Sequence, residues 1–218
     1  MGYCIVHGEA LDRKQRSHAL LARHGIPFYE GLPVIETEAE TELRDGEEVM
    51  RRAMCLFATS QAAIADDAGA SEALLDRWGL ADALSPAERA FFSARPFLDR
   101  ERIQMSWRSE ALIPLMWATG LIDEMPFPDN HFDFEYLAEF WTSVPKGYWR
   151  DVGVRDTAAV LDQADLIYRL HWSVRDAQSK GTSPPGSLHG GVVVERHRAL
   201  NWLIGYGGTA WDDVRTDT

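Results

Sequence analysis

The chain has 218 residues and a formal net charge of −12, and 45% of its residues are hydrophobic, including 8 tryptophans. This length fits one domain with a sizeable core, and the hydrophobic content excludes a largely disordered chain. The negative charge argues against general binding to nucleic acid or anionic membranes, because both require a basic face. It is compatible with a basic protein partner, although solubility is a sufficient reason for it as well.

The sequence also bears on the compartment and on covalent chemistry. No apolar run approaches the roughly 18 residues that a membrane-spanning helix needs. Residues 1–8 lack the basic and apolar regions of a secretory signal. Cys4 and Cys55 are too few for a disulfide framework and do not have metal-ligand spacing. We therefore expect a cytoplasmic protein that needs no cofactor and no metal.

Helix signals are frequent from the start of the chain, and strand signals are scarce. Asp12, with Gln15 three residues later, is typical of a helix start, and Gly25-Ile26-Pro27 should end that helix. Residues 26–44 are predicted to be a long connection, in which Val34-Ile35 is the only candidate strand. The first helix is therefore followed by a loop rather than by a second regular element.

Three more helix starts follow. Asp45-Gly46-Glu47-Glu48 should begin a helix that buries one face, formed by Val49, Met50, Ala53, Met54, Leu56, Phe57 and Ile64. A short helix is predicted between Ser71 and Gly79. Ser85-Pro86-Ala87-Glu88 combines a hydroxyl cap, a proline at the first helical position and a glutamate at the third, and it predicts another helix.

The next predicted helix runs from Asp99 to about Gly120, and Pro114 inside it should kink it or open its hydrogen-bond ladder. Loops over 122–132 and 144–155 should flank a helix around Trp141. The last two long helices are predicted from Asp156 or Thr157 to Gly181, and from Val192 to Tyr206.

About eight helices with almost no strand predict an all-α fold. We expect a single-domain orthogonal helical bundle over residues 12–218. Residues 1–11 are expected to be an N-terminal extension that can be disordered.

Three of these helices each place one ionisable side chain on an apolar face, namely Glu110, His171 and His197. Burying such groups costs free energy unless each finds a partner. They could converge in one pocket that transfers protons, or each could be satisfied separately inside the bundle. No His-x-x-x-His or Glu-x-x-His unit occurs, which argues against a metal site.

Other polar and aromatic side chains accompany these three candidates. We expect a binding surface or polar network formed by Arg108, Tyr168, Arg169, Trp172, Arg175, Glu195, Arg196, Asn201, Trp202, Asp212 and Asp217. Its arginines can supply counter-charge to Glu110, and Asn201 lies one helical turn from His197. Trp211 should dock the C-terminal tail on the bundle, where the acids of the tail could pair with arginines of the two preceding helices. A solvated tail is the alternative.

Segments along nearly the whole chain share one further pattern. They are Arg13–Ser17, Gly25–Pro27, Leu80–Arg89, Glu101–Leu112, Gly120–Glu124, Tyr168–Trp172, Val194–His197, Ala199–Leu203 and Thr216–Thr218. Together they resemble a bacterial family, the domain of unknown function 4272 (DUF4272), and only about the first dozen residues lie outside the resemblance. The family carries no established activity, cofactor or catalytic residue, so the resemblance implies no role for any residue here.

No phosphate-binding loop, dinucleotide-binding fingerprint or nucleophile elbow is present. We therefore predict a cytoplasmic binding protein without catalysis that acts through a protein partner, for example one that neutralises a basic toxin domain. The alternative is a small-molecule hydrolase or lyase with Glu110, His171 and His197 as acid and base groups, and with Arg169 or Arg175 binding an anionic substrate. A structural module whose polar network only sets the helix register is a third possibility.

Overall fold

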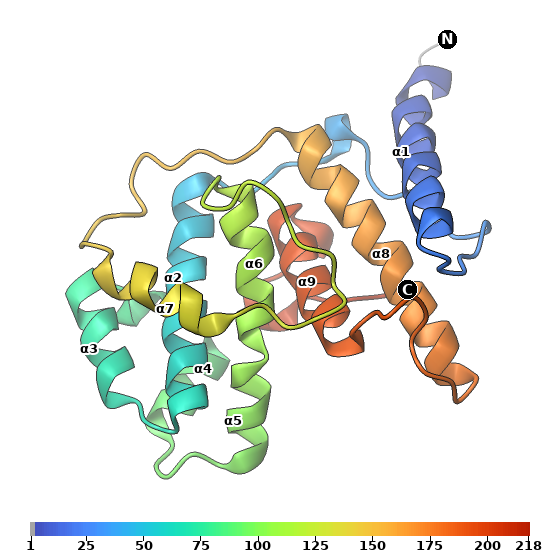
Figure 1. Cartoon of the computed structure of the whole chain (residues 1–218). Coiled ribbons are helices and arrows are strands. Elements are labelled where there is room, and N and C mark those ends of the chain that lie inside the picture. The colour runs from blue at the N-terminus through green and yellow to red at the C-terminus, as the bar shows by residue number, and fades with distance from the viewer. Residues whose placement is uncertain (1–2) are drawn as a thin grey trace.

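A computed structural model describes the backbone of residues 3–218 and the side chains from residue 8 onward (Figure 1). The described part is all-α and has no strand, as predicted, and Val34-Ile35 stays outside regular structure. The helices are α1 (Tyr3–Arg23), α2 (Gly46–Ala65), α3 (Gly69–Trp78), α4 (Pro86–Ser93), α5 (Asp99–Ser106), α6 (Arg108–Ala118), α7 (Phe134–Ser143), α8 (Thr157–Ser179) and α9 (Gly190–Leu203). Short 3₁₀ turns are formed by Glu38–Glu40, Ala81–Ala83, Tyr206–Gly208 and Trp211–Asp213.

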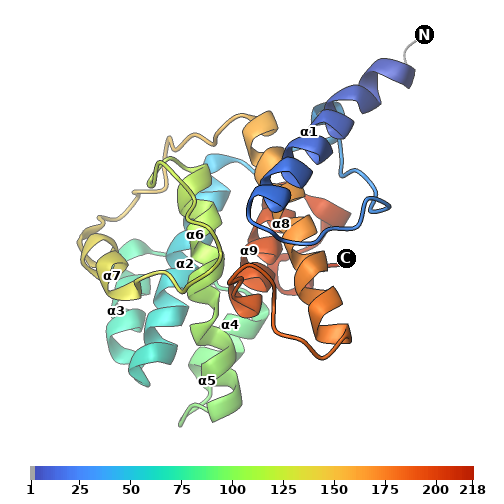
Figure 2. The ribbon, with the colours of Figure 1, turned by 45° about the vertical axis from the view of Figure 1, so that its right-hand side comes forward.

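The helices form a row in which α2, α6, α9, α8 and α1 pack side by side in that order (Figures 1 and 2). Helix α2, at one end of this row, also packs against α3 and α5. It is buried around most of its circumference, since small residues such as Ala53 and Ala58 let neighbouring helices approach closely. One apolar core runs along the row, from Leu21 of α1 to Val214 in the C-terminal tail.

Three predicted helix starts are confirmed by their cap hydrogen bonds. Asp45 accepts from the backbone N–H of Glu48, and Asp156 accepts from that of Ala159, each at 2.8 Å. Ser85 forms the reciprocal capping box at the start of α4. These caps satisfy backbone donors that the first turn of a helix leaves unpaired.

The first helix begins earlier than predicted. Helix α1 starts at Tyr3, so residues 3–11 of the expected extension are helical, whereas residues 1–2 lie outside the described part. Two contacts account for the longer helix. Ala10 is buried, and Glu9 accepts a hydrogen bond of 2.7 Å from the backbone N–H of Glu38. Asp12 is thus an exposed residue inside the helix rather than its cap.

The predicted helix over 99–120 is interrupted at Trp107 and not at Pro114, which lies inside α6. Near the interruption the hydroxyls of Ser106 and Ser109 donate to the carbonyls of Ile103 and Ser106, at 2.8 and 2.9 Å. Side-chain donors of this kind compete with the helical backbone ladder. The break thus lies beside these serine hydroxyls and not at the proline.

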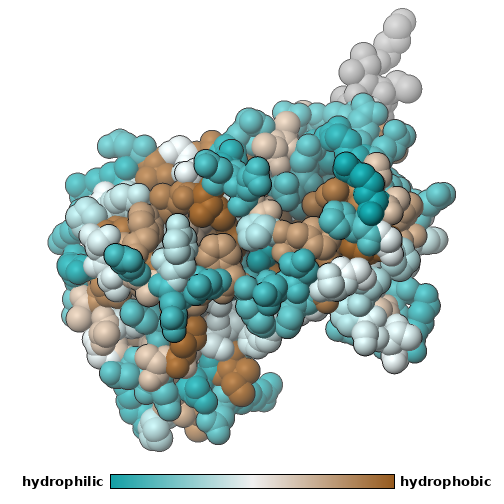
Figure 3. Space-filling view, in the orientation of Figure 1, coloured by the Kyte–Doolittle hydropathy of each residue, from teal (hydrophilic) through white to brown (hydrophobic). Residues whose placement is uncertain are grey.

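Ile64 was predicted to belong to the buried face of α2, but 49% of this residue is exposed. The last turn of α2 extends past the main core to a small second cluster, which contains Ala62 and Ala63. Hydrophilic side chains cover most of the face in Figure 3, and apolar ones form several separate patches on it. None of the described helices combines the length and apolarity that crossing a membrane requires.

Candidate functional site

Two of the three predicted ionisable residues meet in the core. His171 of α8 and His197 of α9 are 4% and 2% exposed, and their Nδ1 atoms lie 2.8 Å apart. The rings are nearly perpendicular, at 81° with 5.1 Å between their centroids. This distance is a hydrogen bond in which one Nδ1 donates and the other accepts. The two imidazoles therefore satisfy each other.

Both imidazoles are neutral near pH 7. Burial, together with the nearby charge of Arg175, lowers the pKa of His171 to about 4. Burial and the neighbouring His171 lower the pKa of His197 to about 3, against the opposing effect of a hydrogen bond to Asn201. The amide of Asn201 donates at 2.8 Å to the carbonyl of Arg215, so hydrogen bonds connect the tail to the histidine pair.

Glu110 does not join the histidines, so the alternative in which all three groups converge in one pocket is not formed. Its Oε2 accepts from Arg196 Nη2 at 3.1 Å, and its Oε1 accepts from the backbone N–H of Phe132 at 2.8 Å. His131 Nδ1 lies 3.4 Å from the same Oε1. Arg196 and His197 are consecutive residues of α9, so their side chains diverge by about 100° around the helix. One therefore reaches α6 and the other α8.

The predicted arginines are largely paired inside the protein. Arg169 is fully buried and binds Asp165 through two hydrogen bonds of 2.8 and 2.6 Å. Arg108 links α6 to α9 by donating to Glu195 at 2.8 Å. Arg175 is exposed. The buried guanidinium groups therefore already have carboxylate partners and are not available to an anionic ligand.

A small pocket of about 240 Å³ lies beside the histidine pair. Of the predicted residues, Tyr168, His197, Asn201 and Asp217 line it. Burial raises the pKa of Tyr168, whose phenol therefore stays protonated at neutral pH. Trp172 is directed elsewhere and stacks on Tyr29, with 5.8 Å between the ring centroids.

Trp211 docks the C-terminal tail as predicted. It is 5% exposed and meets Trp202 of α9 edge-on, with 5.5 Å between the ring centroids. Asp212 does not pair with an arginine as expected. Its Oδ2 accepts at 2.8 Å from the backbone N–H of Ala87, in the first turn of α4. Unpaired N–H groups and the helix dipole both favour a carboxylate at that position.

The remaining polar contacts of the tail also differ from the prediction. Asp217 pairs at 3.1 Å with Arg215 of the tail itself, and both side chains are largely exposed. Arg198 of α9 donates at 3.2 Å to the carbonyl of Val214. The arginine of the preceding helix thus binds the tail backbone rather than its acids, because a docked tail must pair its buried carbonyls.

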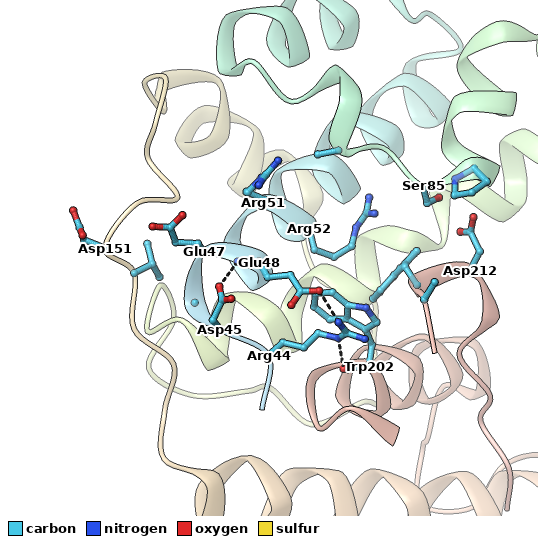
Figure 4. Close-up of a pocket in the computed structure, with 16 residues that line it drawn as sticks. Arg44, Asp45, Glu47, Glu48, Arg51, Arg52, Ser85, Asp151, Trp202 and Asp212 are labelled. Carbon is cyan, nitrogen blue, oxygen red and sulfur yellow. Dashed lines mark hydrogen bonds and ion pairs between the residues drawn. The ribbon is translucent and has the colours of Figure 1, made fainter. Parts of the chain in front are cut away.

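A larger cleft of about 910 Å³ opens beside the docked tail (Figure 4). The residues that line it come from the start of α2, the start of α4, residues 151–152, Trp202 of α9 and residues 210–212. Among them, only Trp202 and Asp212 were predicted from the sequence as site residues. The caps at Asp45 and Ser85 predicted where α2 and α4 begin. A cap does not indicate, however, that these two helix starts lie beside each other in the folded protein.

Two arginines flank a pair of adjacent tryptophans along one side of this cleft. Arg44 Cζ lies 4.4 Å from the ring centroid of Trp202, and Arg52 Cζ lies 5.3 Å from that of Trp211. Arg44 also donates at 2.8 Å to the carbonyl of Trp202, and Arg52 pairs with the buried Glu88. Both guanidinium groups are therefore held by the protein and form part of the wall.

The charges at the opening of the cleft are less constrained. Figure 4 shows Glu47 and Asp151 at one end, and neither forms a hydrogen bond or ion pair within the described chain. Arg51 is a lining guanidinium that is likewise unpaired among the described residues. The lining comprises five carboxylates and three guanidinium groups, which leaves an excess of negative charge.

Gly46 determines how closely the segment with Asp151 approaches α2. A Cβ atom at this position would lie 1.8 Å from the carbonyl oxygen of Val152, far inside van der Waals contact. The absence of a side chain at the first position of α2 therefore lets residues 151–152 approach the start of α2, on the same side of the cleft as Glu47. Across the described residues, no three His, Cys, Asp or Glu side chains are grouped so as to hold a metal ion.

No curated protein and no solved structure matches this chain. The family model described as "Domain of unknown function (DUF4272)" matches residues 13–214. The match includes α2 to α9, both histidines and all the segments that line the large cleft, and it leaves only the first part of α1 and the last residues of the tail outside. This confirms the resemblance that the sequence segments indicated, and the chain belongs to the DUF4272 family.

Proposed function

We propose that this protein is a non-catalytic, acidic binding protein of the cytoplasm that acts through a basic protein partner. The observation that carries the proposal is the cleft of Figure 4, where Glu47 and Asp151 are unpaired beside a wall of tryptophan and arginine. One concrete version is the neutralisation of a basic toxin domain.

The charges of the cleft favour a cationic segment over an anionic one. Arg44 and Arg52 already have partners in the protein, so Arg51 is the lining cation left to attract an anion in the described chain. A lysine or arginine of the partner could pair with Glu47 and Asp151, while its aliphatic stem lies on neighbouring apolar surface. A single pair of this kind contributes only about 0 to 1 kcal/mol, so several would have to act together.

The net charge of −12 supports the same proposal through the rate of association. An acidic protein attracts a basic partner over about 10 Å at moderate salt, which raises the association rate. Charge alone, however, would not select one partner. Selectivity requires that the cleft contribute more than the rest of the acidic surface.

A charge-reversal experiment tests this point with a labelled oligo-arginine peptide as the probe. The variant Glu47→Lys/Asp151→Lys should bind the peptide at least about tenfold more weakly than the wild type. Glu124→Lys/Glu135→Lys is the matched control, because it makes the same charge change at two exposed carboxylates outside the cleft. Equal weakening by both variants would assign binding to net charge and refute the cleft. A pull-down should capture basic proteins with the wild type and the control, but not with the cleft variant.

A second candidate function, a small-molecule hydrolase or lyase, rests on the smaller pocket. Tyr168, His197 and Asn201 line it together, and the neutral His197 is in a protonation state that can accept a proton. Glu110 and Arg169 have other partners, so this version depends on the histidine pair alone. Hydrolysis of a p-nitrophenyl ester panel that is lost in folded His197→Gln would favour it. No turnover above that of the variant would count against it.

A further inference from the structure

A third cavity, of about 190 Å³, lies between the end of α1, helices α8 and α9, and the loop over 125–128. Figure 2 shows the end of α1 against α8 in this part of the molecule. Its lining is mainly apolar and includes Leu20, Leu166, Ile167, Leu170 and Leu200. None of these residues lines the large cleft, so this site is independent of the function proposed above.

Arg196 also lines this cavity, although it is only 1% exposed. Its Nη1 donates at 2.5 Å to the carbonyl of Pro126, and its Nη2 donates at 3.1 Å to Glu110. Its Nε–H is buried and finds no acceptor in the described chain. Buried donors in folded proteins nearly always have an acceptor. Among the unpaired buried donors of the described chain, Arg196 is the one that lines this cavity, so a ligand there could supply the acceptor atom.

The surrounding charges restrict what that atom can belong to. Glu110 already balances the charge of Arg196. An anionic ligand would place a second negative charge near Glu110 in apolar surroundings, and a cationic ligand would meet the guanidinium of Arg196. Both arrangements carry a high cost in a low-dielectric site. An uncharged acceptor, by contrast, satisfies the N–H without adding charge.

We propose that this cavity binds a small uncharged molecule with an apolar body and one carbonyl oxygen, which accepts a hydrogen bond from Arg196 Nε. The leucine-rich lining contacts the apolar body, and the buried N–H selects the carbonyl. The volume allows a compact ligand such as a cyclic ketone, a short ester or a small amide.

A matched pair of probes tests the proposal. Cyclohexanone and methylenecyclohexane have nearly the same shape, but only the ketone carries an acceptor. In titrations followed by amide NMR shifts of α8 and α9, cyclohexanone should bind about tenfold more tightly, as a hydrogen bond from a charged donor predicts. Equal affinity for cyclohexanone and methylenecyclohexane would show that the N–H of Arg196 does not bind the carbonyl. Preferential binding of cyclohexanecarboxylate would show an anion site. Amide shifts that do not change with cyclohexanone would show that the cavity does not bind such a molecule and holds only water. Each of these three results overturns the proposal.

Cavity-filling variants assign the binding to this site without removing the buried charge. Leu166→Phe should fill the cavity and abolish the shifts caused by cyclohexanone, while the protein stays folded. Leu11→Phe makes the same substitution at a leucine of α1 that is 49% exposed, and it should leave binding unchanged. Loss of binding in both variants, or in neither, contradicts the assignment. Because the oligo-arginine test concerns another cleft, either proposal can fail while the other holds.

Discussion

His171 and His197 give each other a hydrogen bond that their apolar neighbours could not provide. A hydrogen bond to Asn201 raises the pKa of His197 and partly offsets the effect of burial. Between the two Nδ1 atoms of the pair, one donates and the other accepts. The i, i+4 spacing from His197 to Asn201 was visible in the sequence, whereas the pairing with His171 of another helix was not.

The pair predicts how stability depends on pH. In the unfolded chain both imidazoles bind protons near pH 6.5, but in the folded protein they stay neutral down to pH values of about 4 and about 3. The unfolded state thus binds more protons in this window, and stability decreases as the pH falls. The free energy of unfolding should drop by about 3 kcal/mol or more between pH 6.5 and pH 4.

Denaturant unfolding at a series of pH values measures this dependence. His171→Leu/His197→Leu removes both imidazoles and keeps the carboxylates that also titrate in acid. Its unfolding free energy should vary much less over the same pH range, whatever its absolute value. A wild type and a variant with the same pH slope would show that the histidines are not responsible.

At the scale of elements, α9 connects two neighbours through side chains on different faces. Arg196 binds Glu110 of α6, and His197 binds His171 of α8. Such a helix carries buried polar side chains on more than one face. The sequence of α9 therefore does not separate cleanly into one apolar face and one polar face. Helix α2 also contacts several helices at once, but mainly through apolar side chains.

The buried pair between α6 and α9 predicts a measurable coupling. Glu110→Gln and Arg196→Met should each destabilise the protein by about 3 kcal/mol, because each leaves a buried partner unpaired. The double variant should lose less than the sum of the two, by about 1 kcal/mol or more. Denaturant unfolding of the four proteins gives this difference. The exposed pair of Lys180 and Asp176 is the control, and Lys180→Met should cost less than about 1 kcal/mol. Additive losses for Glu110 and Arg196 would rule out the coupling.

At the scale of the whole molecule, the large cleft depends on segments that are far apart in the chain. Residues 151–152 contact the start of α2, and the tail beyond residue 209 packs on α9 and on the start of α4. Each segment is ordinary by itself. Their meeting creates the wall of Trp202 and Trp211 and places Asp151 near Glu47 (Figure 4).

A substitution at Gly46 tests the contact between the start of α2 and residues 151–152. Gly46→Ala should push residues 151–152 away from α2, because the added Cβ would lie 1.8 Å from the carbonyl oxygen of Val152. We expect a loss of about 2 kcal/mol in denaturant unfolding and weaker binding of oligo-arginine. Gly153→Ala lies in the same segment, and its Cβ would meet no atom within 4 Å, so it should be tolerated. Wild-type stability in Gly46→Ala would contradict the contact.

Much of the fold was predictable because helix signals act over a few residues. The caps at Asp45, Ser85 and Asp156 depend on groups within one turn, and the structure confirms them. The errors arose where another segment intervened or where a competing local contact was stronger. Glu9 in the unpredicted part of α1 binds the distant Glu38, and the helix break at Trp107 lies beside serine hydroxyls that donate to backbone carbonyls.

The all-α class, most helix positions and the ionisable groups on apolar faces were predictable from the residues alone, because periodicity and caps encode these features within single helices. The segments that resemble the family were visible in the same way. Three features depend instead on the packing of the helices: Glu110 pairs with Arg196, the two histidines pair with each other, and α2, α4 and the tail enclose a cleft. Those partners lie in separate helices, and which side chains meet depends on how the helices pack against one another, which no pattern within one helix encodes.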